Sequence, residues 1–429
     1  MLYHLFNYLA SRGVDFPGMN LMHYLSFRAI LASIFAVTFA LIFGNWFVKK
    51  LRGRKDVLEG EREEDAQTAG QNQKKNTPGF GGVIIILGIL FGVLMFADLT
   101  NIYILLLIFS LLWCGALGFA DDYIKAIKKN KKGIPGKVKL LCQIILGFVI
   151  GLTVWMSPNI VVREKVEDPT RTEEEIVTSG RYAKEDVVKS TKTTIPFVKT
   201  HEFDYKWLSP FKGAMGWYTK WAIYVLVIIF IITACSNGVN LTDGLDGLAS
   251  GTSAIVGVVI GILAWLSGNL IDSEYLNIMY LPGTGEIAVF MAAMVGALLG
   301  FLWYNSYPAA IFMGDTGSLA LGGVIGVSAV LLRKELLLPL LCGIFFMESL
   351  SVILQTTFFK IYKRRHGGAE GRIWSRTPLH HHFQANKIPG GYIRHPKPNP
   401  PHHEAKVTLR FWIVGILLAV STLALLKLR

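Results

Sequence analysis

The sequence predicts an all-α polytopic membrane protein of about ten transmembrane helices, with both termini extracytoplasmic and its active-site loops in the cytoplasm. Hydrophobic residues make up 52% of the 429 positions, and the mean hydropathy is +0.44. Apolar stretches long enough to cross a bilayer recur along the chain, and basic residues gather in particular loops between them. A soluble fold does not fit this composition.

Apolar stretches of about 17 to 25 residues mark the spans. They lie at 26–48, 81–98, 101–120, 138–156, 219–236, 248–267, 286–304, 317–332, 336–360 and 408–427. The segment 1–24 lacks the continuous apolar core of a removable signal peptide, so the first span is expected to act as the insertion signal. A break within 336–360 is conceivable, with Pro339 and Gly343 as its helix-breaking residues.

The basic loops fix the predicted orientation. Lysine and arginine are concentrated in the loops 49–80 and 121–139, which places both in the cytoplasm. Counting spans from there puts the loops 237–247, 305–316 and 361–407 on the same side. All acidic and histidine motifs then share one face, which argues for a single site. The formal net charge of +13 is interpreted as topology signals and contacts to an anionic substrate, and no nucleic acid is expected.

The segment 157–207 is predicted to be an extracytoplasmic insertion within a single membrane domain, 1–429. It mixes acidic and basic residues and contains no apolar span. Its alternating apolar residues permit one or two short β-hairpins, and disorder is an equally open interpretation. Because it lies outside, it should not carry catalysis.

Three acidic motifs occur at span boundaries on the predicted cytoplasmic face. Asp121-Asp122 follow the third span, Asp243 and Asp246 lie in the glycine-punctuated run 240–249, and Asp315 precedes the eighth span. Each motif alone fits a helix cap, but carboxylates near hydrocarbon are costly unless paired or bound to a cation. Five aspartates from three loops suit Mg²⁺, a hard cation that is usually coordinated by carboxylates together with substrate phosphates. The sequence therefore predicts chemistry on a pyrophosphate.

Two further motifs are ambiguous by themselves. Asn305 opens the loop before Asp315 and is either a cap or a ligand. Three consecutive histidines, His380 to His382, follow several arginines in the predicted cytoplasmic loop 361–407. They indicate phosphate or pyrophosphate binding, with a solvated interfacial loop as the alternative.

Together these motifs resemble a known enzyme family. The run NLTDGLDGLA at 240–249, the Asp121-Asp122 pair, GDTGS at 314–318 and PLHHHF at 378–383 are similar to the phospho-N-acetylmuramoyl-pentapeptide transferases. This family is a branch of the polyprenyl-phosphate N-acetylhexosamine-1-phosphate transferase superfamily. The triple histidine favours this branch over the other branches of the superfamily. The resemblance implies transfer of phospho-MurNAc-pentapeptide from UDP-MurNAc-pentapeptide to undecaprenyl phosphate, giving lipid I and UMP with Mg²⁺. It also implies a bacterial inner-membrane location and a possible homodimer.

The resemblance also implies roles for individual residues. Asp121 would be the base or phosphate-activating carboxylate with Asp122 beside it, His380 would help to organise the site, and Asp315 and Asp243 would hold the metal. Substrate contacts are implied for Lys74, Lys75, Lys125, Lys137, Asn240, Asp243, Asp246, Asn305, Phe312, His381 and His382. The chain departs from the family pattern at Asn76, which replaces a glycine, and this leaves open which of Lys74 and Lys75 has the basic role.

The residues leave several alternatives open. The transfer could run in one step or through an aspartyl-phosphoryl enzyme. A sister transferase acting on a GlcNAc-1-phosphate donor is the nearest enzymatic rival. An ion-coupled transporter is the rival from another class, although carboxylates at span ends favour an interfacial enzyme.

Overall fold

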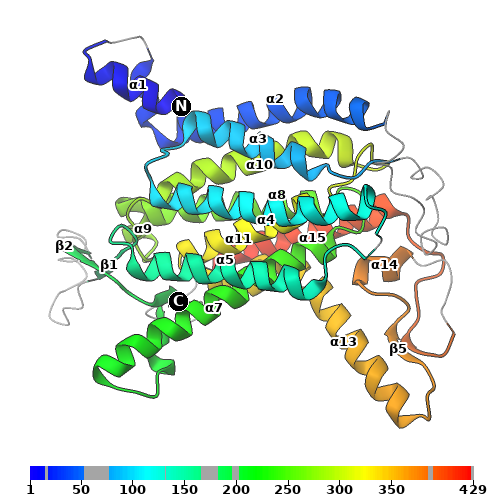
Figure 1. Cartoon of the computed structure of the whole chain (residues 1–429). Coiled ribbons are helices and arrows are strands. Elements are labelled where there is room, and N and C mark those ends of the chain that lie inside the picture. The colour runs from blue at the N-terminus through cyan, green and yellow to red at the C-terminus, as the bar shows by residue number, and fades with distance from the viewer. Residues whose placement is uncertain are drawn as a thin grey trace.

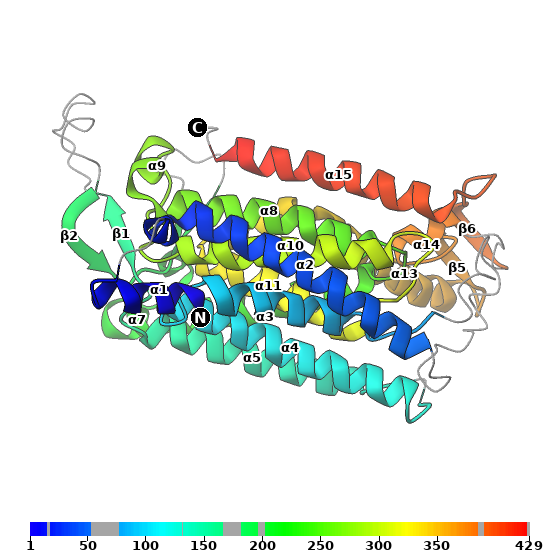
Figure 2. The same cartoon turned by 90° about the horizontal axis from the view of Figure 1, so that it is seen from above.

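The protein forms a bundle of helices that run roughly along one direction, with small sheets at its ends, as the computed structural model shows (Figures 1 and 2). The structure describes the whole chain except residues 15–17, 53–76, 131, 166–181, 196–201, 385–389 and 427–429. The prediction of an all-α polytopic membrane protein is confirmed.

Nine of the ten predicted spans are helices that are long and apolar enough to cross a membrane, counted within the described residues. They are α2 (Leu25–Arg52), α4 (Ile102–Ala126), α5 (Gly136–Met156), α7 (Gly213–Thr242), α8 (Leu248–Gly268), α10 (Gly285–Asn305), α11 (Gly314–Leu331), α13 (Gly343–Arg365) and α15 (Glu404–Leu425). The remaining span, 81–98, is the shorter helix α3 (Gly82–Phe96), which packs against α2 and α10. Short helices α1 (Leu2–Ser11) and α9 (Leu270–Tyr275) lie at one end of the bundle.

Helix α11 forms the centre of the bundle. Every residue from Thr316 to Leu331 is buried, and α4, α7, α3 and α8 pack around it. Glycine, alanine and serine make up about half of this helix. Small residues let neighbouring backbones approach closely, which is how helices pack in a membrane. The residues at the start of α11 are therefore held on several sides.

The ninth predicted span is interrupted. A 3₁₀ turn (Glu335–Leu337) and the short helix α12 (Leu338–Leu341) precede α13, so the break falls between Leu341 and Gly343. Pro339 occupies the first turn of α12, where its missing N–H is not needed. Beyond the break, α13 leaves the bundle at an angle, and its far end projects past the neighbouring spans (Figure 1).

The insertion at 157–207 contains two antiparallel strand pairs, as the alternating residues permitted. Strand β1 (Val162–Lys165) pairs with β2 (Tyr182–Val188), and β3 (Lys192–Thr194) pairs with β4 (Glu202–Asp204). The Thr194 backbone N–H and the Thr193 hydroxyl both donate to the Arg333 carbonyl, just beyond α11. The insertion is thus attached to the end of α11 that is opposite to Asp315.

Both termini lie at the same end of the bundle, which is also the end that carries β1 and β2 (Figure 2). The opposite end carries the segment after α13, with the parallel pair β5 (Gly371–Trp374) and β6 (Tyr392–His395) and the short helix α14 (Leu379–Gln384). The acidic motifs also meet at that end, as the distances below show. The motifs therefore share one end of the bundle, as the count of spans predicted.

A buried ion pair joins α2 to α10 near the end that carries the termini. The Arg28 guanidinium donates two hydrogen bonds to the Glu286 carboxylate, at 2.9 and 2.5 Å, and a third to the Phe96 carbonyl at 3.3 Å. The two side chains are only 5% and 12% exposed. Removing one partner of such a pair leaves a buried charge without compensation.

We expect Glu286→Leu to lower the free energy of unfolding by about 3 kcal/mol, because Arg28 is left buried and unpaired. The double variant Arg28→Met/Glu286→Leu should recover most of this loss, because it removes both charges. Thermal unfolding of the three proteins in one detergent measures the effect. A double variant as unstable as Glu286→Leu would show that the ion pair itself is not what the single change disrupts.

Candidate active site

Three aspartates from two helices form a largely buried cluster at the end of the bundle opposite the termini. Asp121 and Asp122 lie in the last two turns of α4, and Asp315 lies in the first turn of α11. Asp121 has no exposed side-chain surface, and one carboxylate oxygen from each of the three residues lies within 4.8 Å of the others. The predicted loop position of Asp121-Asp122 is wrong, because α4 continues six residues beyond Ala120.

Two glycines allow this close approach. A Cβ atom on Gly118 would overlap the Asp315 carbonyl, so α4 and α11 cross with almost no side chain between them. Gly314 has a φ of 73°, a conformation that glycine adopts without strain, and a Cβ there would meet the Asp122 carboxylate. The positions of the carboxylates are therefore set by backbone packing.

Asp122 caps α11 from the neighbouring helix. Its Oδ1 accepts from the Asp315 backbone N–H at 3.0 Å, and its Oδ2 accepts from the Thr316 N–H at 2.9 Å and from the Thr316 hydroxyl at 2.5 Å. These N–H groups belong to the first turn of α11, which has no intrahelical partner for them. The carboxylate also lies at the positive end of the helix dipole. Asp122 therefore holds the start of α11 against α4.

Two lysines bridge the other two aspartates. Lys125 Nζ lies 2.5 Å from Asp121 Oδ2 and 3.2 Å from Asp315 Oδ2, and Lys139 Nζ, from α5, lies 3.0 and 2.5 Å from the same two oxygens. The remaining oxygen of Asp121 accepts from the Ile134 N–H at 2.6 Å. Lys125 was predicted from the sequence, but Lys139 was not. Lys137, for which a substrate contact is predicted, lies on the exposed side of α5.

Asn240 links the 240–249 segment to the cluster. It lies on the last turn of α7, which extends past the predicted end of the fifth span, and its amide donates to Asp315 Oδ1 and to the Ser318 hydroxyl, each at 2.9 Å. Asp243 follows at the end of the helix and is half-buried. Among the described residues the three clustered carboxylates are those of Asp121, Asp122 and Asp315. Asp243 is not one of them, and its role as a metal ligand stays a prediction.

Asp246 and Asn305 are buried and bonded to the protein backbone. Asp246 Oδ2 accepts from the Ala309 N–H at 3.0 Å. Asn305 Oδ1 accepts from the Gly247 N–H at 3.1 Å, and its amide donates to the Ile311 carbonyl at 3.0 Å. These bonds tie together the turn between α7 and α8 and the loop between α10 and α11. Asn305 thus bonds the backbone at the start of α8, and its role as a substrate ligand stays a prediction.

The histidine run forms α14, which lies against the 240–249 segment. His380 is fully buried; its backbone N–H donates to Glu348 Oε1 at 3.2 Å, and its Nδ1 lies 3.3 Å from Glu348 Oε2. A Cβ on Gly244 would overlap His380 Nε2, so the imidazole contacts this glycine directly. Glu348 was not predicted, although it is the one acidic residue of the predicted span 336–360.

The other two histidines differ in their surroundings. The His381 ring lies 4.2 Å from the His380 ring, measured between centroids, and is half-buried. His382 Nδ1 accepts from the Ser375 N–H at 3.3 Å, which fixes the imidazole toward β5. Burial lowers the pKa of His382, and the nearby His395 lowers it further. A neutral His382 therefore holds the fold of this segment.

Comparisons with known proteins show the family of the chain. The model of Glycosyl transferase family 4 matches residues 187–333. The chain is 48% identical over 431 residues to a phospho-N-acetylmuramoyl-pentapeptide-transferase of Parabacteroides distasonis and 49% identical over 430 residues to one of Flavobacterium psychrophilum. Each alignment covers 100% of both chains. The chain belongs to the phospho-N-acetylmuramoyl-pentapeptide-transferase family. A 48% identical relative with the same name comes from Porphyromonas gingivalis.

Not every residue expected in a phospho-N-acetylmuramoyl-pentapeptide-transferase can be placed. Lys74 and Lys75 lie outside the described residues. Phe312 is half-buried in the loop before α11, where its N–H donates to the Pro78 carbonyl at 2.9 Å and its carbonyl accepts from Gly81. The described residues 77–81 before α3 therefore run beside the loop before α11. This brings the chain that follows the two lysines close to the acidic cluster.

The acidic cluster of this transferase fits a hard divalent cation. Asp121, Asp122 and Asp315 offer oxygen ligands only, and their carboxylates converge. Two ammonium groups already lie between Asp121 and Asp315, which shows that positive charge is stabilised at this place. Both oxygens of Asp122 are held by the N–H groups and the hydroxyl of α11, whereas Asp121 Oδ2 and Asp315 Oδ2 share the two mobile ammonium groups, which a metal ion could replace. Asp121 and Asp315 are therefore the better ligand candidates.

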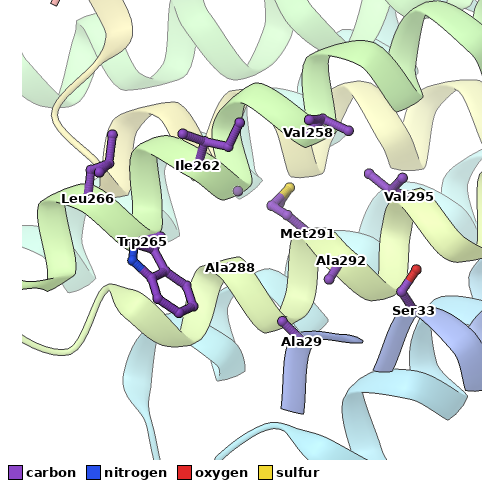
Figure 3. Close-up of a pocket in the computed structure, with 12 residues that line it drawn as sticks. Ala29, Ser33, Val258, Ile262, Trp265, Leu266, Ala288, Met291, Ala292 and Val295 are labelled. Atoms are coloured by element: carbon purple, nitrogen blue, oxygen red, sulfur yellow. The ribbon is translucent and has the colours of Figure 1, made fainter. Parts of the chain in front are cut away.

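A separate apolar groove of about 430 Å³ lies between α2, α8 and α10 of the transferase. Figure 3 shows Met291 and Trp265 among its lining residues, together with small side chains such as Ala29 and Ser33. The groove contains none of the site residues named above. It is therefore not the place where the polar chemistry occurs.

Proposed function

We propose that the chain transfers phospho-MurNAc-pentapeptide from UDP-MurNAc-pentapeptide to undecaprenyl phosphate, giving lipid I and UMP, and that it depends on Mg²⁺. The observation that carries this proposal is the buried Asp121, Asp122 and Asp315 cluster with its two lysines, at one end of a membrane-spanning bundle. A lipid phosphate and a water-soluble nucleotide can meet only at such an end. A bacterial inner membrane is the location that the family suggests.

The residues of the cluster supply charge compensation. The attacking oxygen of a lipid phosphate is already ionised at neutral pH, so the step needs positive charge more than it needs a base. Lys125 and Lys139 can turn from the aspartates toward the diphosphate, since their side chains are 31% and 18% exposed. Mg²⁺, when bound by Asp315 and Asp121, would offset the charge that develops as UMP leaves.

We propose a direct attack of the lipid phosphate on the β-phosphate of the donor. The fixed backbone positions of Asp121 and Asp315 suit a reaction that depends on alignment and electrostatics. Release of UMP should then require undecaprenyl phosphate. Detection of a labelled phosphoryl-protein adduct in the absence of acceptor lipid would contradict the direct attack and indicate a two-step mechanism.

UMP release by the purified protein in detergent tests the function. With UDP-MurNAc-pentapeptide, undecaprenyl phosphate and Mg²⁺ we expect turnover that stops in EDTA and returns when Mg²⁺ is added in excess. UDP-GlcNAc should give no turnover under the same conditions. Turnover with UDP-GlcNAc alone would identify the protein as a sister transferase. No UMP release with either donor would contradict the proposed transferase activity.

A further inference from the structure

Helix α15 touches the 240–249 segment through three side chains that are spaced by four residues. Glu404, Thr408 and Trp412 lie along one side of the helix, because residues four apart are neighbours on a helix surface. Each bonds a backbone group of Asp246 or Gly247. These contacts connect α15 through the segment to Asn240, which bonds Asp315 of the aspartate cluster.

The three contacts are short and mostly buried. Glu404 Oε1 accepts from the Asp246 N–H at 2.7 Å, the Thr408 hydroxyl donates to the Asp246 carbonyl at 3.1 Å, and Trp412 Nε1 donates to the Gly247 carbonyl at 3.2 Å. Glu404 and Thr408 are 5% and 6% exposed. A carboxylate that accepts from a buried N–H makes one of the stronger hydrogen bonds in a protein.

The opposite side of the same turn is held by other elements. Asn305 accepts from the Gly247 N–H, and Asp246 Oδ2 accepts from the Ala309 N–H. The backbone at Asp246 and Gly247 is therefore fixed from α10, from the loop after α10 and from α15. Gly247 has a φ of 75° and lies immediately before α8, where the chain turns after α7.

The 240–249 segment, which contains this turn, contacts the site at two places. Asn240, at the start of the segment, bonds Asp315, and Gly244 lies against His380. Asp243 lies between these two contacts. A shift of the turn at Asp246 would therefore move Asp243 and loosen the contacts that connect it to the cluster.

We infer that Glu404, supported by Thr408 and Trp412, is a positioning residue that holds the 240–249 segment in the geometry needed to bind the sugar-nucleotide donor. This inference rests on the proposed function for its kinetic part. Its structural part, the restraint of the segment by Glu404, does not need turnover. The carboxylate acts through the Asp246 N–H.

Kinetics of Glu404→Ala and Glu404→Gln test the inference. Glu404→Ala should raise the KM for UDP-MurNAc-pentapeptide about tenfold and leave the KM for undecaprenyl phosphate within about twofold. Glu404→Gln should restore the donor KM to within about twofold, because its amide oxygen can still accept from Asp246. Thr408→Val, which loses only the hydroxyl donor, should give a smaller rise in donor KM.

Leu409→Ala is the matched control on the same helix. Leu409 is 56% exposed and follows Thr408 directly, so its replacement should leave both KM values and the melting temperature unchanged. Hydrogen exchange of peptides that cover residues 240–251 gives the second readout. Exchange should rise in Glu404→Ala and stay at the wild-type level in Glu404→Gln and Leu409→Ala.

Two results would overturn the inference. One is a Glu404→Ala protein with wild-type donor KM and wild-type exchange. The other is a Glu404→Gln protein as impaired as Glu404→Ala, with an equal fall in melting temperature, which would make Glu404 a residue of general stability. If the wild type shows no turnover, the proposed function fails, and the exchange comparison still decides whether Glu404 restrains the segment.

Discussion

Asp315→Asn is expected to lower UMP release about a thousandfold, because it removes the charge on which two lysines and the proposed metal converge. Asparagine keeps the shape of the side chain and can still accept from Asn240. The loss therefore reports the missing negative charge rather than a change in packing. Single-turnover UMP release measures it, and Mn²⁺ binding followed by electron paramagnetic resonance should weaken in parallel.

Asp272→Asn is the control for this change. Asp272 lies in the first turn of α9, at the end of the bundle opposite the cluster, so the same chemical change there should leave UMP release and Mn²⁺ binding at wild-type levels. An Asp315→Asn protein that keeps more than about a tenth of the wild-type rate would remove Asp315 from the centre of the mechanism.

Gly118→Ala is expected to lower UMP release about a hundredfold, because one added methyl group must separate α4 from α11. The new Cβ would overlap the Asp315 carbonyl, which is backbone and cannot rotate away. Asp121 would then be displaced from Asp315, and displacements of about 1 Å at a reacting centre cost rates of this size. Turnover together with the melting temperature distinguishes a displaced site from an unfolded protein.

Gly136→Ala provides the matched control. Gly136 starts α5, and a Cβ there would meet no atom within 4 Å. This variant should keep the wild-type rate and melting temperature. Wild-type turnover in Gly118→Ala would mean that the α4 and α11 crossing can open without cost, and that backbone contact does not set the distance between the carboxylates.

Hydropathy was sufficient to predict the spans but not where the helices end. The predicted third and fifth spans stop at 120 and 236, whereas α4 continues to Ala126 and α7 to Thr242. A prediction based on hydropathy places the end of a span at the first polar residue, even where the helix continues. Here Asp122 can continue as helix because α11 supplies the hydrogen bonds that its carboxylate needs. Tertiary partners of this kind are not visible in local composition.

The place of Lys139 beside the cluster could be predicted from the helix periodicity of the sequence. Lys139, Gln143 and Leu146 follow the spacing of one helix face, and Gln143 is a polar residue inside an apolar run. That face packs on α7, which places Lys139 beside the cluster. The role of Asn305 had no such signal, because an amide that caps and an amide that binds a ligand have the same sequence.

The two lysines between Asp121 and Asp315 have a consequence for biogenesis. A newly made chain that packed these carboxylates together without positive charge would need a bound cation to offset their repulsion. Here α4 and α5 each bring an ammonium group to the aspartates as they come together. The ammonium groups therefore offset the charge of Asp121 and Asp315 within the protein itself, before any metal or nucleotide binds.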